Sequence, residues 1–156
     1  MVHLLHGALV IFFALCCLFF FAFVPFYGQE IVRCDAEFAW AYTPCLLWAW
    51  AFALPIMIAF VPAWKIVSTI AEKHGSFRAE NARRFRLLSV LCAADGVIFP
   101  AGMLVLAFMG AGSAPLTIVI TPLVMLICFA LALVFYVLHR LVAEAAQLRE
   151  ENELTI

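Results

Sequence analysis

One carboxyl group stands alone in the most apolar part of the sequence. Asp95 is the only formally charged residue between Leu87 and Leu138, and it follows Arg86 by nine positions, about 13 Å along a helix. A carboxylate at the centre of a bilayer costs about 3 kcal/mol on insertion scales, so Asp95 is expected to face protein and to be neutral. Two roles fit it: a proton- or ligand-sensing group in a small cavity, or a buried hydrogen bond between helices.

The expected partner of Asp95 lies in a second apolar stretch. Counting the same distance inward from Trp64 reaches Pro55, which has no N–H to offer the carbonyl of Ala51. We therefore predict that Asp95 donates a hydrogen bond to this stretch, near the Ala51 carbonyl or polar groups close by.

Six cysteines could carry redox chemistry. Cys34 and Cys45 both fall at or near one predicted membrane surface, where oxidation would give a disulfide; the alternative is two free thiols. The remaining four stand in apolar runs and are expected to be small core residues: Cys16, Cys17, Cys92 and Cys128. The sequence has no C-x-x-C pair, which argues against a disulfide oxidase.

The four histidines fall near the opposite membrane surface: His3, His6, His74 and His139. They lack the paired spacing of haem or metal ligands, so interfacial polar roles are expected. No nucleophile-and-base pair or metal cluster is evident on one side. The sequence therefore predicts neither an enzyme nor a bound cofactor or metal.

The elements that hold these residues must lie in a membrane. Of 156 residues, 68% are hydrophobic and 12% charged, with a mean hydropathy of +1.13. So few charges cannot cover a water-soluble surface, which excludes a soluble enzyme and a free nucleic-acid binder.

Uncharged runs predict four membrane spans in one integral membrane domain, residues 1–156. They cover about residues 4–24, 42–64, 87–109 and 116–138. Pro25 is expected to end the first span before an outer loop at 26–38, and a Gly-rich turn at 110–115 separates the last two. The predicted fold is all-α, a four-helix transmembrane bundle with cytoplasmic helical extensions. Small residues are expected to line the contacts of the third span: Ala93, Ala94, Gly96, Ala101 and Gly102.

Basic residues orient these spans. Six of the nine lie in the Lys65–Arg86 connection, two follow the fourth span, and only Arg33 lies between the first two. The positive-inside rule then places both termini of this multi-pass protein in the cytoplasm. The middle connection is basic and the tail acidic, so Glu150, Glu151 and Glu153 are hypothesised to dock on Arg83, Arg84 and Arg86.

The cytoplasmic segments have local patterns of their own. In the middle connection, Gly75 is expected to end one helix and Ser76 to cap the next. Glu80 and Arg84 are four apart, as in an exposed ion pair. Residues 139–156 form an amphipathic tail, with apolar positions recurring every three or four residues.

Two of these segments carry a family resemblance. The run SFRAENARRFR at 76–86 and the closing LREENELTI at 148–156 resemble the central loop and acidic end of a poorly characterised bacterial family of four-helix membrane proteins, which carries a domain-of-unknown-function label. The resemblance implies a bacterial inner membrane as the location, a chain of similar length, and a gene beside a small Cro/CI-type helix-turn-helix regulator.

The resemblance suggests which residues contact a partner. The matching positions are Phe77, Glu80, Asn81, Leu154 and Thr155, and neighbouring charges add Arg84, Glu150 and Glu151. The alternative is that Glu80 and Asn81 only cap and solvate a helix start.

Two functions are compatible with this sequence. The leading hypothesis is a membrane sensor or anchor for a cytoplasmic helix-turn-helix transcription regulator. The alternative is a small proton- or cation-coupled transporter or exporter subunit that uses Asp95. The lipid bilayer is a certain partner, a homo-oligomer stays open, and direct nucleic-acid binding is not expected.

Overall fold

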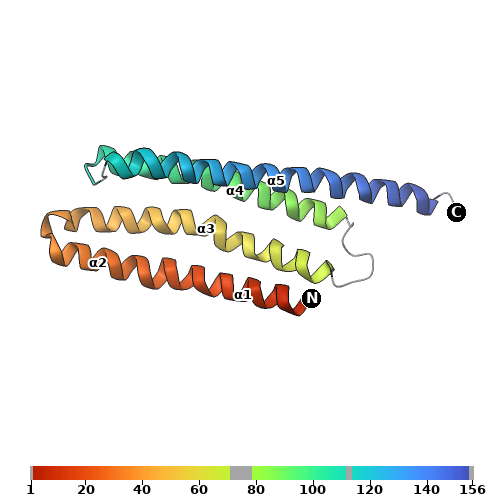
Figure 1. Cartoon of the computed structure of the whole chain (residues 1–156), viewed down its shortest axis with the longest axis horizontal. Coiled ribbons are helices and arrows are strands. Elements are labelled where there is room, and N and C mark those ends of the chain that lie inside the picture. Colours follow the sequence, from red (N-terminus) through yellow and green to blue (C-terminus); the bar gives the residue numbers. More distant parts are fainter. Residues whose placement is uncertain (1, 71–78, 112–113, 155–156) are drawn as a thin grey trace.

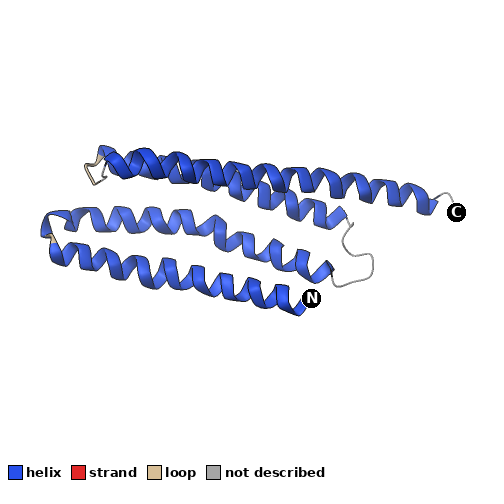
Figure 2. Ribbon diagram, viewed as in Figure 1, coloured by secondary structure: helices blue, strands red, loops and turns tan. Residues whose placement is uncertain are grey.

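The computed structural model describes residues 2–70, 79–111 and 114–154, and nearly all of them are helical (Figures 1 and 2). The elements are α1 (Val2–Leu18), a π-helical turn (Phe19–Phe23), α2 (Val24–Cys34), a 3₁₀ turn (Ala36–Phe38), α3 (Ala39–Ile70), α4 (Ala79–Phe108) and α5 (Ala114–Leu154). Four stretches are long and apolar enough to cross a membrane. The predicted all-α fold with four such helices is confirmed.

The first long helix passes through Pro25 instead of ending there. The π-helical turn pairs the N–H of Val24 with the carbonyl of Phe19, five residues back. In this register the N–H group that Pro25 lacks would have donated to the carbonyl of Phe20. The indole Nε1 of Trp50 lies 3.4 Å from that carbonyl and donates to it instead. The helix therefore continues to Cys34, and most of the expected 26–38 loop is helical.

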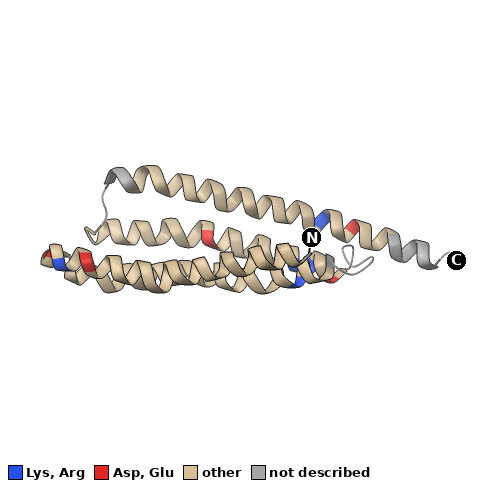
Figure 3. Cartoon of the chain, turned by 60° about the horizontal axis from the view of Figure 1, so that its bottom comes forward, with Lys and Arg blue, Asp and Glu red and all other residues tan. Residues whose placement is uncertain are grey.

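The long helices lie in a row that follows the chain. Close backbone approaches join α1 and α2 to α3, α3 to α4, and α4 to α5. Within the described part of the chain, α5 does not approach α3 or the first helix. Figures 1 and 3 together show this order, with both termini at one end.

The turn between α4 and α5 is built on Gly110. This glycine has φ +79°, and the N–H groups of Gly110 and Ala111 bond the carbonyls of Ala107 and Leu106. Such a left-handed cap closes a helix without the steric cost of a Cβ atom. It lies in the predicted 110–115 turn. The connection between α3 and α4, with Gly75 and Ser76, lies outside the described residues.

Apart from Asp95 in the middle of α4, the charged residues lie toward the two ends of the molecule (Figure 3). We call the end that holds both termini the basic end; Lys65, Arg83, Arg84, Arg86 and Arg140 lie toward it. The opposite end carries Arg33 beside Glu30. This distribution agrees with the charge pattern expected of a multi-pass membrane protein.

Candidate functional site

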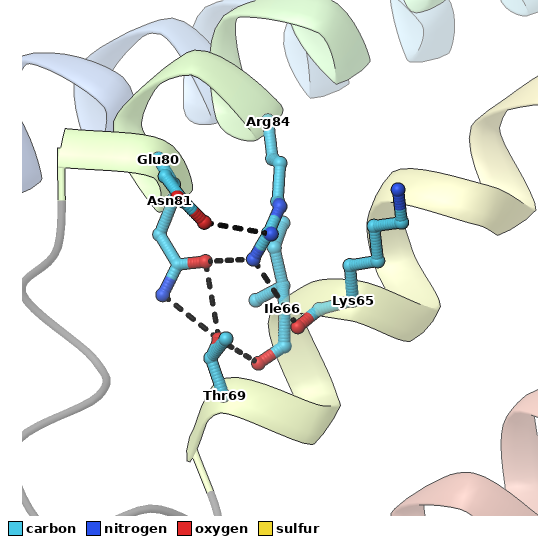
Figure 4. A network of polar contacts seen from close by, with 6 residues as sticks. All are labelled: Lys65, Ile66, Thr69, Glu80, Asn81 and Arg84. Carbon is cyan, nitrogen blue, oxygen red and sulfur yellow. Dashed lines mark hydrogen bonds and ion pairs between the residues drawn. The ribbon is translucent and has the colours of Figure 1, made fainter.

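A polar network joins α3 to α4 at the basic end (Figure 4). Nδ2 of Asn81 donates to Oγ1 of Thr69 at 2.9 Å, and that hydroxyl donates to the carbonyl of Ile66 at 2.8 Å. Nη1 of Arg84 donates to Oδ1 of Asn81 at 2.8 Å and reaches the carbonyl of Lys65 at 3.4 Å. Asn81 is 1% exposed, so its amide is enclosed by these contacts.

Glu80 closes the outer side of this network. Its Oε2 lies 3.1 Å from Nη2 of Arg84, which confirms the ion pair expected from the four-residue spacing. The side chain of Glu80 is 70% exposed and that of Arg84 is 20% exposed. Of the proposed partner contacts, Glu80 is therefore open to solvent, Arg84 is largely covered, and Asn81 is used inside the protein.

At the same end of the molecule, two histidines make polar contacts between the other neighbouring helices, α1 with α3 and α5 with α4. Nε2 of His6 lies 3.0 Å from Oγ of Ser68, which joins α1 to α3. Nδ1 of His139 donates to the carbonyl of Ala82 at 2.8 Å, which joins α5 to α4. Every neighbouring pair of long helices thus has a polar contact at the basic end. Among the described residues, no three His, Cys, Asp or Glu side chains form a metal-binding group.

Several residues predicted to act at the basic end fall outside what the structure describes. Phe77 and Thr155 lie outside the described residues, and so do the side chains of Glu150, Glu151 and Leu154. The backbone still tests one hypothesis. Because His139 is level with Ala82, Arg84 is level with position 137, and positions 150 and 151 lie about 20 Å further along α5. With α5 helical to Leu154, the acidic tail does not dock on Arg84 of the same chain.

Asp95 is buried between helices, with 7% of its surface exposed. Two contacts fix the register of α3 on α4: Thr69 meets Asn81, and Trp48 packs on Gly102. Since these helices are antiparallel, moving 14 residues from Asn81 to Asp95 corresponds to moving 14 residues back from Thr69, which reaches Pro55. The predicted depth of Asp95 opposite Pro55 agrees with this register.

The hydrogen bond predicted for Asp95 is not formed in the structure. Its Oδ1 is buried without a partner among the described residues. On the facing helix Ala51 is exposed, whereas Ala53 and Pro55 are buried. The thiols of Cys92 and Cys128 lie within electrostatic reach of its carboxyl group.

The predicted disulfide is not formed either. All six cysteines are free, with Cys34 exposed and Cys45 partly buried. Because Tyr42 packs on Gly28, Cys45 is level with Pro25, nine residues and about 13 Å along the helix from Cys34. A disulfide needs Cα atoms within about 7 Å. The helical continuation past Pro25 is what separates the two thiols.

Sequence reasoning missed the residues that join the helices. Thr69 and Ser68 were not singled out, and Ser89, whose hydroxyl donates to the Ala132 carbonyl at 2.7 Å, was also missed. The sequence did contain a pattern that predicts the Thr69–Asn81 contact. Thr69 comes just before the connection between the second and third spans, and Asn81 lies close to where the next helix begins. Antiparallel neighbours bring such positions together.

Four long apolar helices, with basic side chains gathered toward one end, define a multi-pass membrane protein. The chain belongs to the family described as a protein of unknown function, DUF2975, whose model matches residues 28–156. No curated protein and no solved structure matches the chain.

Proposed function

We propose that this protein is a non-catalytic sensor or anchor, in a bacterial inner membrane, for a small cytoplasmic helix-turn-helix transcription regulator. The observation that carries the proposal is the length of α5, whose far end projects past the other helices (Figure 1). The family resemblance of the middle connection and the tail supports the choice of partner.

The projecting part of α5 can be measured from its contact with α4. His139 is level with Ala82, three residues after α4 begins, so residues 143–154 extend about 18 Å beyond that first residue. Leu141 and Leu148, seven residues apart, are 58% and 62% exposed. A helix with apolar side chains on one face and Arg140 and Glu144 exposed beside them suits an amphipathic contact with another protein.

The orientation supports a cytoplasmic partner. The basic end holds most of the described Lys and Arg residues, and the positive-inside rule assigns such an end to the cytoplasm. The projecting helix and the exposed carboxylate of Glu80 would then face the compartment in which a transcription regulator folds.

Co-purification from native membranes tests this function. A tagged wild-type chain is expected to recover a small helix-turn-helix protein, identified by mass spectrometry. Leu148→Ser should lower the recovery about tenfold, because one buried leucine contributes enough to change an affinity by that factor. Leu4→Ser is the matched control, since Leu4 is also exposed near the basic end. Recovery of no such regulator, or an equal loss in both variants, would contradict the proposal.

The burial of Asp95 supports a second candidate function. The protein would then be a small proton- or cation-coupled transporter or exporter subunit that acts alone or as a homo-oligomer. A carboxyl group buried at mid-membrane depth, whose Oδ1 has no hydrogen-bond partner in the described part of the chain, suits such coupling. Proton-driven uptake or efflux in vesicles that is lost in Asp95→Asn, with normal membrane insertion, would support it. Transport unaffected by Asp95→Asn would remove this candidate.

A further inference from the structure

An apolar cavity opens between the first long helix and α3, in the half of the molecule away from the basic end. Its volume is about 420 Å³, within the range of about 300 to 1,000 Å³ usual for ligand pockets. The walls are almost wholly apolar and largely aromatic, with Phe19, Phe23, Trp48 and Phe52 among them. Because these residues lie within the candidate spans, acyl chains are the surrounding solvent.

A second cavity adjoins the first on the side of the α2–α3 turn. It has a volume of about 260 Å³ and is lined by Gln29, Val32, Arg33, Ala39 and Tyr42. Tyr42 lines both cavities. The two together therefore run from an aromatic region at membrane depth to a region at the membrane surface that Gln29 and Arg33 help to line.

Local packing explains why Tyr42 stands at this junction. Its ring lies against Gly28, where a Cβ atom would come within 2.8 Å of it, and its hydroxyl is 3.5 Å from the carbonyl of Pro25. The glycine lets the ring approach the backbone of α2. Tyr42 therefore lines both cavities, and its hydroxyl is directed toward Pro25.

The second cavity lies beside a pair of opposite charges. Nη1 of Arg33 donates to Oε1 of Glu30 at 2.7 Å, and 71% of the Arg33 side chain and 42% of the Glu30 side chain are exposed. Guanidinium groups bind phosphate oxygens through several N–H donors, and a carboxylate accepts from an ammonium group. The pair is complementary to a headgroup that carries a phosphate and an ammonium.

We propose that the two cavities form one binding site for a zwitterionic phospholipid with an ammonium headgroup. One acyl chain lies in the aromatic cavity, the phosphate meets Arg33 and Gln29, and the ammonium meets Glu30. This site lies at the end away from the proposed regulator and does not depend on that function.

The site is tested by the lipid that stays with the purified chain. Membranes are solubilised in detergent, and phosphatidylethanolamine, phosphatidylglycerol and diacylglycerol are offered in mixed micelles before washing and mass spectrometry. Wild type is expected to retain phosphatidylethanolamine in preference to the other two. Ala49→Leu fills the aromatic cavity, which Ala49 lines, and should reduce that retention about tenfold. Ala51→Leu, exposed two residues away on the same helix, is the matched control and should retain the lipid.

A surface variant separates loss of the site from loss of the fold. Arg33→Gln changes an exposed side chain, and should weaken phosphatidylethanolamine retention about tenfold while diacylglycerol retention is unchanged. Circular dichroism verifies the helical content of each variant. Equal retention by Ala49→Leu and Ala51→Leu, no effect of Arg33→Gln, or a wild-type preference for phosphatidylglycerol would overturn the proposal.

Discussion

At the level of single residues, Asn81 holds the most enclosed position in the described chain. Its amide bridges Thr69 of α3 and Arg84 of α4, so both of its polar atoms are used. Because Asn81 is 1% exposed, water is not there to replace these hydrogen bonds, and the bridge stabilises the helix pair. Asn81 therefore acts as an internal connector, although the sequence alone suggested a helix cap or a partner contact.

Removing the Asn81 amide should weaken the α3–α4 pair. Asn81→Ala leaves Thr69 with one partner fewer and Arg84 without its buried acceptor, which is expected to lower the free energy of unfolding by about 1 to 2 kcal/mol. The measurement is a denaturation curve in detergent micelles. Glu80→Ala removes only the exposed ion pair and should change stability by about 0.5 kcal/mol or less. Equal effects of the two changes would contradict the connector role.

Asp95 has the opposite character, because its buried Oδ1 has no partner among the described residues. A buried polar group without a hydrogen bond costs about 1 to 3 kcal/mol, so Asp95→Val should raise the unfolding free energy by about 1 kcal/mol. Asp95→Asn keeps polar atoms in place and should leave stability nearly unchanged. Thermal unfolding of both variants measures this. A valine variant less stable than the asparagine variant would show that Asp95 has a stabilising partner.

The contrast between these two residues marks what the sequence could predict. The depth of Asp95 followed from counting along two helices, because helical rise is constant and charges mark the membrane boundary. Its hydrogen bond did not follow, because the direction in which a carbonyl points depends on how each helix is rotated. Rotation is set by packing against neighbours, which a single sequence does not display.

At the level of elements, small residues decide how closely the helices approach. Gly102 lies directly under the indole of Trp48, and Gly96 under Phe129 and Cys128. Both were predicted as contact positions of the third span. Ala101, predicted with them, is exposed instead. Position in a run of small residues was not enough, since the rotation of the helix decides which of them face a neighbour.

Gly102 is therefore expected to be sensitive to the smallest side chain. A Cβ atom at this position would overlap the Trp48 ring, so Gly102→Ala should separate α3 from α4 and destabilise the fold by about 1 to 3 kcal/mol. Gly7→Ala is the matched control, because no atom lies within 4 Å of a Cβ atom there. Unfolding in detergent should show loss in the first variant alone. A stable Gly102→Ala chain would mean that the indole has room to move.

The first long helix shows where sequence rules for proline were insufficient. Pro25 was expected to end the span, because a proline removes a backbone donor. The π-helical turn before it moves the affected carbonyl to Phe20, where Trp50 supplies an N–H instead. The donor comes from another helix, so no local pattern could reveal it. The same continuation places Gln29 and Arg33 on a helix beside Tyr42 and moves Cys34 away from Cys45.

At the level of the whole molecule, a nearly neutral chain has two chemically different ends. The net charge of −1 conceals a basic end held together by Asn81 and two histidines, and an opposite end with Arg33 beside Glu30. The sequence predicted this division well, because charge placement along the chain becomes placement along the membrane normal once the spans are known. The order of the helices in a row was not predicted, since it depends on which faces pack.

The orientation of the molecule gives a prediction that its own cysteines can test. Cys34 is exposed at the end opposite the termini, whereas the other five are only partly exposed within the candidate spans. If the basic end is cytoplasmic, a membrane-impermeant maleimide should label Cys34 in intact spheroplasts, and Cys34→Ser should abolish that labelling. A cysteine introduced by Glu144→Cys into the Cys34→Ser chain lies at the basic end, on a side chain that is 62% exposed. It should react only after permeabilisation, because the bilayer excludes a charged reagent. The reverse pattern would invert the molecule and place the projecting α5 helix outside the cell, where a transcription regulator could not reach it.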